Sequence, residues 1–191
     1  MYHIKNDQRA IRSSQMLYDG LARLMREKPF NAITVTDLVE SAQVGRTTFY
    51  RNFDEIEDIL RMRCDQTFDE LITYVVEYLR QNPNEIHTAT LKPMLRYFYL
   101  HSDIVELLML AKRIDIIQDS FQARLQPFKK QVIARHEIAE EYVDYAIAIR
   151  IGVLTNILIQ WIENGKRHAP DELANTLGAM IGKMVTLDQL L

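Results

Sequence analysis

The sequence predicts an all-α protein in which a small three-helix unit is followed by a larger helical domain. Only six Gly and five Pro occur among 191 residues, so turns are few and the elements between them are long. Apolar residues recur at helical spacing, and no segment shows the alternation of a β-strand. The content of 48% hydrophobic and 26% charged residues is ordinary for a soluble globular protein.

The first predicted helix covers residues 10–25 and carries one largely apolar face. That face comprises Ala10, Ser14, Leu17, Tyr18, Leu21, Leu24 and Met25. Pro29 ends the helix, because the residue before a proline is disfavoured in helical geometry.

Two short helices follow, separated by the turn "QVG" at residues 43–45. Thr34 is a good N-cap for the first of them, and Asp37 completes a loose capping box. The second helix starts at Arg46 and should bury Phe49 and Phe53, which lie four residues apart. This leaves Arg46, Thr47, Tyr50 and Arg51 on the opposite face, flanked by Thr48 and Asn52.

This pattern matches a helix-turn-helix, in which the first helix supports a second helix that enters the major groove of DNA. Arg side chains can form bidentate bonds to guanine, and hydroxyl and amide groups suit phosphate oxygens. Residues 1–52 also carry a net charge of +3, whereas the rest of the chain carries −6. A basic front on an acidic body is consistent with one DNA-facing end. The pattern alone leaves open that these side chains form an ordinary solvated helix face.

The remaining helices are expected to be long. One long helix, or two in sequence, is expected over 54–81 and closes at "NPN" (82–84), and further helices are expected over 92–100 and 102–110. Residues 115–136 continue helically with a kink or break at Pro127. A helix of about 25 residues then ends at Gly165, and Pro170 opens the last one.

The segment "ITVTDLVESAQVGRTTFYRNFDEIEDIL" (33–60) resembles the DNA-binding domain of TetR-type transcriptional regulators. The residues that carry the resemblance are Thr34, Leu38, Ala42, Val44, Thr48, Phe49, Tyr50 and Phe53. The match covers residues 9 to about 62. It implies a DNA-binding domain over 1–53, a helical effector-binding and dimerisation domain over 54–191, and a dimeric regulator, commonly a repressor, that binds a double-stranded operator under the control of a ligand.

The residues expected to bind DNA are Thr34, Arg46, Thr47, Thr48, Tyr50, Arg51 and Asn52. Four positions depart from the pattern of the family. Gln43 stands where Gly is usual and must then adopt an unfavourable backbone geometry, and Gly45 replaces a capping Ser. Asn52 replaces a common His, and Ile56 replaces a Lys that would contact phosphate.

The segment 142–162 carries apolar residues on two faces, which indicates a central helix or one shared with a partner. The resemblance implies a four-helix homodimer interface here, and a core lying within one chain is the alternative. The residues expected at the interface are Tyr145, Ile149, Gly152, Val153, Asn156, Ile157, Trp161, Gly178 and Gly182.

The middle segment, residues 60–135, is rich in Tyr, Phe and Met, and the resemblance implies an effector pocket there for a small molecule or a protein. The polar candidates for this pocket are Tyr74, Tyr78, Tyr97, His101 and Arg113. For each of them, ordinary packing or surface exposure is the competing interpretation.

No enzyme is expected, since the five His are scattered and no P-loop, H-E-x-x-H or G-x-S-x-G motif occurs. We therefore expect no cofactor and no metal site. A single cysteine, Cys64, and an N-terminus without an apolar signal region suggest a cytoplasmic protein. Arg150, Asn156 and Gln160 interrupt the most apolar stretch and argue against a membrane span. The alternative function is a helical adaptor that dimerises and binds a protein, with residual DNA contact.

Overall fold

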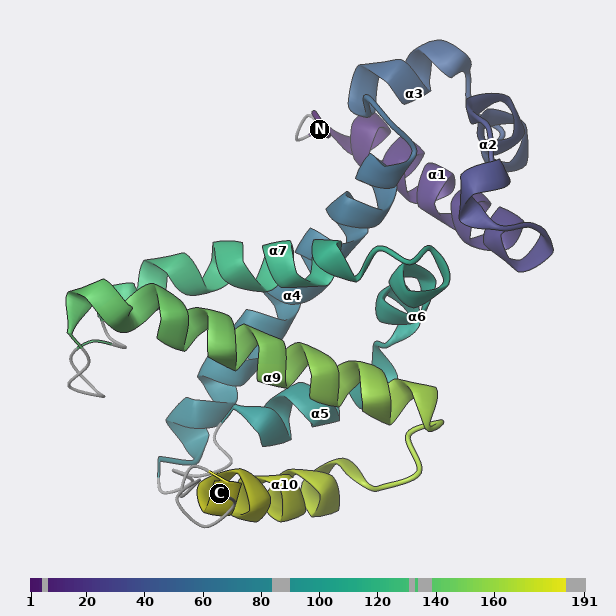
Figure 1. Cartoon of the computed structure of the whole chain (residues 1–191). Helices are drawn as coiled ribbons and strands as arrows, with labels where there is room; N and C mark the ends of the chain where they lie inside the picture. The colour runs from purple at the N-terminus through teal and green to yellow at the C-terminus, as the bar shows by residue number, and fades with distance from the viewer. Residues whose placement is uncertain (5–6, 84–89, 131–132, 134–138, 185–191) are drawn as a thin grey trace. The chain divides into compact units, whose positions relative to one another are not determined.

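The computed structural model describes residues 1–4, 7–83, 90–130, 133 and 139–184 (Figure 1). The α-helices are α1 (Gln8–Glu27), α2 (Val35–Ala42), α3 (Arg46–Asn52), α4 (Glu57–Gln81), α5 (Leu91–Leu100), α6 (Asp103–Leu110), α7 (Ile114–Leu125), α9 (Val143–Glu163) and α10 (Pro170–Met184). Short 3-10 helices cover Phe30–Ala32, Gln126–Phe128 and Glu140–Tyr142. Within the described ranges, β pairing is confined to an isolated bridge between Tyr2 and Phe53, so the predicted all-α class is confirmed.

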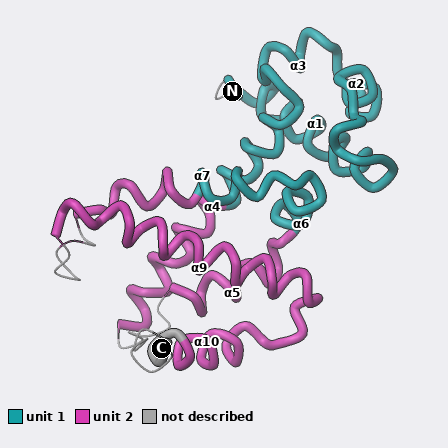
Figure 2. The backbone as a smooth tube through the Cα atoms, viewed as in Figure 1, with its two compact units in different colours: residues 1–67, 103–120 teal, residues 68–102, 121–191 magenta. Residues whose placement is uncertain are grey.

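The chain divides into two compact units (Figure 2). Unit 1 consists of Met1–Thr67 and Asp103–Ser120, and unit 2 consists of Phe68–Ser102 and Phe121–Leu191. The helices α4 and α7 each contribute to both units, because the divisions after residues 67 and 120 fall inside them. These two units are defined by how the chain packs. The predicted boundary after Phe53 instead separates a DNA-binding domain from an effector-binding domain, and this functional boundary stays a prediction.

Unit 1 is organised around α1, which buries the face that the sequence predicts. Its buried residues are Ala10, Ser14, Leu17, Tyr18, Gly20, Leu21 and Met25, and Leu24 is half-buried. Leu38 of α2 is fully buried, as are Phe49 of α3 and Phe53 immediately after it. These side chains give the three-helix head a continuous apolar interior.

In unit 2, aromatic side chains from different helices meet in the core. Phe68 of α4 lies 5.7 Å from Phe98 of α5 and 4.5 Å from Phe121 of α7, measured between ring centroids. The face of α9 that carries Ile147, Ile151 and Leu158 is also buried.

Several helix ends follow the predicted chemistry. Gly165 has φ +68°, and the amides of Gly165 and Lys166 donate to the carbonyls of Ile162 and Trp161, which is the Schellman arrangement. Pro170 is the first residue of α10. The helix α7 ends before Pro127 and continues as a 3-10 turn. Most of the predicted helix beyond residue 130 lies outside the described residues.

The helix α4 begins at Glu57, three residues later than the expected start at Asp54. The amides of Asp54 and Glu55 instead donate to the carboxylate of Asp58, at 3.2 and 2.9 Å. Asp58 thus accepts from the free amides that precede the helix. The helix then runs for 25 residues as a single element.

The segment Glu140–Glu163 is long and apolar enough to cross a membrane by length and composition, with a mean hydropathy of 1.5, a test that core helices of soluble proteins also pass. Only 39% of the apolar window is buried within the chain. Arg150, Asn156 and Gln160 are exposed along α9, and side chains of this kind are costly in lipid. An apolar surface on α9 therefore remains to be explained.

Candidate nucleic-acid interface

The start of α2 is fixed by a capping box. The hydroxyl of Thr34 accepts from the amide of Asp37 at 3.2 Å, and the Asp37 carboxylate accepts from the amide of Thr34 at 2.8 Å. Lys28 donates to the same carboxylate at 2.6 Å and, with Thr34, holds the pKa of Asp37 well below its ordinary value. The predicted cap is confirmed, and the Thr34 hydroxyl is already engaged with Asp37; its contact with DNA stays a prediction.

The turn between α2 and α3 requires an unusual backbone conformation at Gln43. This residue has φ 55° and ψ 41°, the left-handed geometry that the departure from glycine predicted. The amide of Gln43 donates to the carbonyl of Glu40 and that of Val44 to the carbonyl of Val39, which closes α2. Gly45 is the N-cap residue of α3 and provides no side-chain cap, also as expected.

Gly20 positions α2, and the sequence reasoning missed it. A Cβ atom built on Gly20 would lie 2.9 Å from the Cβ and 3.0 Å from the backbone nitrogen of Ala42. Only glycine permits this approach of α1 to the end of α2. The sequence did contain a sign of this contact, because Gly20 lies inside a predicted helix. Glycine there destabilises a helix by about 0.5–1 kcal/mol relative to alanine, so its presence suggests a close packing contact.

The helix α3 separates apolar and polar side chains as predicted. Phe49 and Phe53 have no exposed surface, whereas Arg46, Thr47 and Arg51 are exposed and Tyr50 is 51% exposed. The Arg46 guanidinium lies 6.0 Å from the centroid of the Tyr50 ring, and Thr48 is half-buried. The outer face of α3 therefore presents two cations and two hydroxyl groups, which suit phosphate oxygens and base edges.

Asn52 departs from the expected position beside this polar face. It is 1% exposed, and its side-chain amide donates to the hydroxyl of Ser13 on α1 at 3.2 Å. The backbone carbonyl of Asn52 accepts from the backbone amide of His3 at 2.8 Å. The expected Asn52–phosphate contact is therefore replaced by a contact that fastens the end of α3 to α1, because Asn52 lies on the side of α3 that faces Ser13 of α1.

A shallow hollow lies between the start of α1 and the end of α3. Its lining includes Arg9 and Arg51, and its volume is about 450 Å³. Arg9 is exposed at the first turn of α1, and Asp7, which also lines the hollow, accepts from the amide of Ala10 as the N-cap of this helix. The surface beside α3 therefore carries a further cation.

On α9, the outer face is apolar and accessible. Tyr145 is 70%, Ile149 68% and Val153 40% exposed; Asn156 is exposed, and Gly152 and Ile157 are half-buried. A Cβ atom on Gly152 would meet nothing within 4 Å. Gly178 of α10 is half-buried, and Gly182 lies near the end of α10.

Trp161 differs from the other candidates on α9. It is 3% exposed, and its indole N–H donates to the carbonyl of His168 at 3.1 Å. In the sequence, Trp161 continues the apolar face predicted for residues 142–162. In the structure, the chain folds back after Gly165 and covers the indole ring. Trp161 is therefore part of the core of its own unit.

Three of the effector candidates lie together in unit 2. The ring of Tyr97 lies 5.9 Å from Tyr74 and 4.7 Å from His101, and its hydroxyl donates to Glu70 at 2.9 Å. Tyr78 is 8% exposed beneath the Arg96 guanidinium. Arg113 stands apart in unit 1, where it is paired with Glu57 and Asp115.

The capped α2, its tight turn and the polar outer face of α3 define a helix-turn-helix DNA-binding protein. The family model for bacterial regulatory proteins of the tetR family matches residues 17–61. A second TetR model, described as a transcriptional regulator C-terminal region, matches residues 84–183. The chain therefore belongs to the TetR family of transcriptional regulators.

One curated protein is similar to the chain in sequence, and solved structures are similar to it in fold. The chain is 23% identical over 173 residues to YxbF of Bacillus subtilis (strain 168), an uncharacterized HTH-type transcriptional regulator. That match covers 88% of the chain, which spans only 44% of the length of YxbF.

Among solved structures, Lin0861 from Listeria innocua shares the fold with a TM-score of 0.74 and 17% identity, covering 95% of this chain and 96% of that one. A transcriptional regulator (TerR/AcrR family) from Aquifex aeolicus VF5 has a TM-score of 0.56 at 16% identity, covering 90% and 99% of the two chains.

Proposed function

We propose that the chain acts as a homodimeric repressor whose two α3 helices enter successive major grooves of a palindromic operator. The observation that carries this proposal is that α3 has a buried apolar face and an exposed polar face. Phe49 and Phe53 are fully buried, while Arg46, Tyr50 and Arg51 are exposed at the surface. Three-helix heads read short half-sites, and two-fold pairing about one helical turn apart supplies the specificity.

The outer face of α9 is the proposed dimer surface. Tyr145, Ile149 and Val153 form an accessible apolar stripe, and the exposed Met180 of α10 adds to the apolar surface. Gly152 leaves room for a second helix to approach closely. These features favour a second copy of the chain packed against α9 and α10. Trp161 is left out of this surface because its own chain covers it.

Operator binding would respond to an effector held by the larger helical domain. The cluster of Tyr74, Tyr97 and His101 is the best-supported part of this site, since aromatic rings and a carboxylate partner converge there. A ligand shifts the equilibrium only by its differential affinity for DNA-competent and DNA-incompetent states.

The test is fluorescence anisotropy with DNA that flanks the chain's own gene. We expect sequence-selective binding that weakens steeply with salt, because arginines displace counterions from phosphates. Replacing both Tyr50 and Arg51 by Ala should reduce affinity by about tenfold or more while the helical circular dichroism and the dimer mass stay unchanged. Equal affinity for scrambled DNA would instead favour a helical adaptor.

A further inference from the structure

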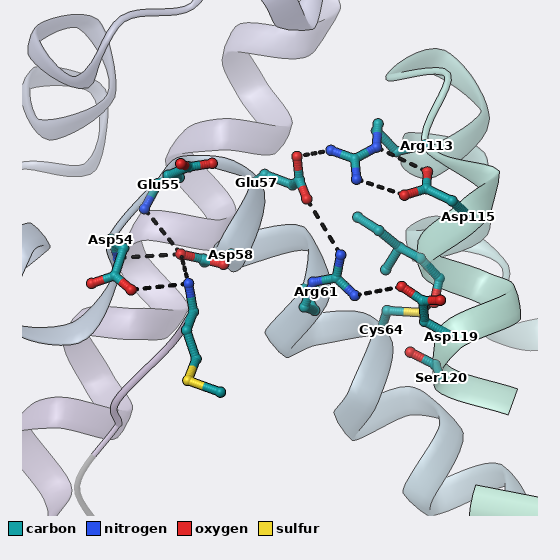
Figure 3. Close-up of polar contacts among 12 residues, drawn as sticks. Asp54, Glu55, Glu57, Asp58, Arg61, Cys64, Arg113, Asp115, Asp119 and Ser120 are labelled. Carbon is teal, nitrogen blue, oxygen red and sulfur yellow. Dashed lines mark hydrogen bonds and ion pairs between the residues drawn. The ribbon is translucent and has the colours of Figure 1, made fainter. Parts of the chain in front are cut away.

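The start of α4 is joined to α7 by a chain of ion pairs (Figure 3). The Glu57 carboxylate pairs with both Arg61 and Arg113. Arg61 reaches Asp119 of α7 at 3.0 Å, and Arg113 donates twice to Asp115, at 2.9 and 2.6 Å. The side chains of Glu57, Arg61 and Arg113 are only 25–30% exposed, so water screens this network less than an isolated surface pair.

Two hydrogen bonds attach the same region at other points. The hydroxyl of Tyr18 on α1 donates to Asp103 at the start of α6 at 2.9 Å, and burial together with Asp103 raises the pKa of Tyr18. Ser120 of α7 donates to Asp65 of α4 at 2.8 Å. The helix α6 and the first half of α7 are thus fastened to α1 and α4 at both of their ends.

We infer that the operator-binding body is discontinuous in sequence and includes Asp103–Ser120 together with the head. Arg113 is a positioning residue within this body, because it ties the α6–α7 turn to Glu57, which follows α3 by five residues. This inference rests on the proposed function. It gives Arg113 a role in holding the recognition helix, in place of the effector contact that the sequence suggested.

The consequence concerns how an effector would act. The chain passes between the two units after residues 67, 102 and 120, and two of these crossings lie inside α4 and α7. A signal from unit 2 would therefore reach α6 and α7 as well as α4. All three connections lead into the body that carries α3.

Hydrogen exchange of the full-length dimer, with and without operator duplex, tests this inference. We expect amides of α6 and of Ile114–Ser120 to gain protection together with those of α1–α3, while α5 and the last turn of α7 do not change. Protection confined to α1–α3 would overturn the inference but leave the proposed function intact. Loss of any DNA-dependent protection, with no operator binding, would mean that the proposed function itself is wrong.

A set of variants tests Arg113 directly. Arg113→Ala should weaken operator binding by roughly fivefold or more and abolish DNA-dependent protection in α6, with the helical circular dichroism retained. Arg113→Lys keeps the positive charge and should retain part of the operator affinity and part of the DNA-dependent protection in α6. Lys112→Ala removes an equal charge from the neighbouring exposed position and should change neither. Equal losses of operator affinity in Lys112→Ala and Arg113→Ala would show that only net charge matters and would overturn the positioning role. If Arg113→Ala unfolds, the test passes to Arg113→Lys, and an unchanged operator affinity in that variant would contradict the positioning role.

Discussion

The helices α3 and α9 bury one face in the same manner but differ in what they leave outside. Inside, α3 places Phe49 and α9 places Leu158, each with no exposed surface. Outside, α3 presents Arg46 and Arg51, whereas α9 presents Ile149, 68% exposed, within an apolar stripe. The inner faces build the units, and the outer faces differ in the kind of partner they suit: a polyanion for α3 and a second apolar surface for α9.

The largest effect should come from placing a charge on the outer face of α9. Ile149→Glu would bury an unpaired carboxylate in both copies of the proposed interface, and we expect the dimer dissociation constant to rise by at least about 100-fold. Sedimentation should then show a monomer that retains its helical content, with operator binding largely lost.

Ile149→Leu is the matched control and should leave the dimer intact, because it keeps the apolar character and the volume of the side chain. A dimer that survives Ile149→Glu would show that a different surface pairs the chains, and it would remove the explanation of the apolar stripe on α9.

Gly20 and Gly152 distinguish a glycine packed inside the head from a glycine on the outer face of α9. Gly20→Ala forces a Cβ atom against the backbone of Ala42, and we expect it to lower the free energy of unfolding by about 1–3 kcal/mol. Gly152→Ala meets nothing in its own chain and should raise helix stability by about 0.5–1 kcal/mol while weakening dimerisation. Denaturant unfolding of both variants, with their dimer masses, checks this contrast; a neutral Gly20→Ala would contradict the close approach of α1 and α2.

The sequence predicted local features well, because they depend on residues a few positions apart. The Thr34 capping box, the burial of Phe49 and Phe53, and the left-handed residue at Gly165 are each decided within one or two turns of helix. The segment 46–53 therefore contained most of the information about the outer face of α3.

Features that depend on distant residues were not predictable in the same way. Spacing on α3 suggested a free Asn52, but Ser13, 39 positions away, and the backbone of His3 enclose it. Trp161 continued the apolar stripe of α9 in sequence and is covered by the segment after Gly165. Arg113 found its partner Glu57 across 56 positions, a pairing that no local pattern indicates.

Asn52 and Arg51 are adjacent but should respond differently to truncation. Asn52→Ala removes a buried hydrogen bond to Ser13, and we expect it to lower the free energy of unfolding by about 1–2 kcal/mol. Arg51→Ala should leave stability within about 0.5 kcal/mol, since the side chain is exposed, and should weaken operator binding instead. Thermal unfolding and anisotropy on both variants separate the two roles; an equally stable Asn52→Ala would restore Asn52 as a candidate DNA contact.

The smallest effect concerns the uncapped start of α3. Gly45 has φ −74° and ψ 146°, which any residue adopts, and a Cβ atom there would lie no closer than 4.0 Å to Thr48. Gly45→Ser should add a side-chain acceptor for the first amides of α3 and stabilise the head by about 0.3 kcal/mol, whereas Gly45→Ala, which supplies no acceptor, should destabilise it by about 0.5 kcal/mol or more. At fixed protein concentration the two midpoints of thermal unfolding should move in opposite directions, the serine variant upward by about 1 °C. Upward shifts for both variants would mean that backbone entropy, and not the missing cap, governs this helix end, because both variants remove the same glycine.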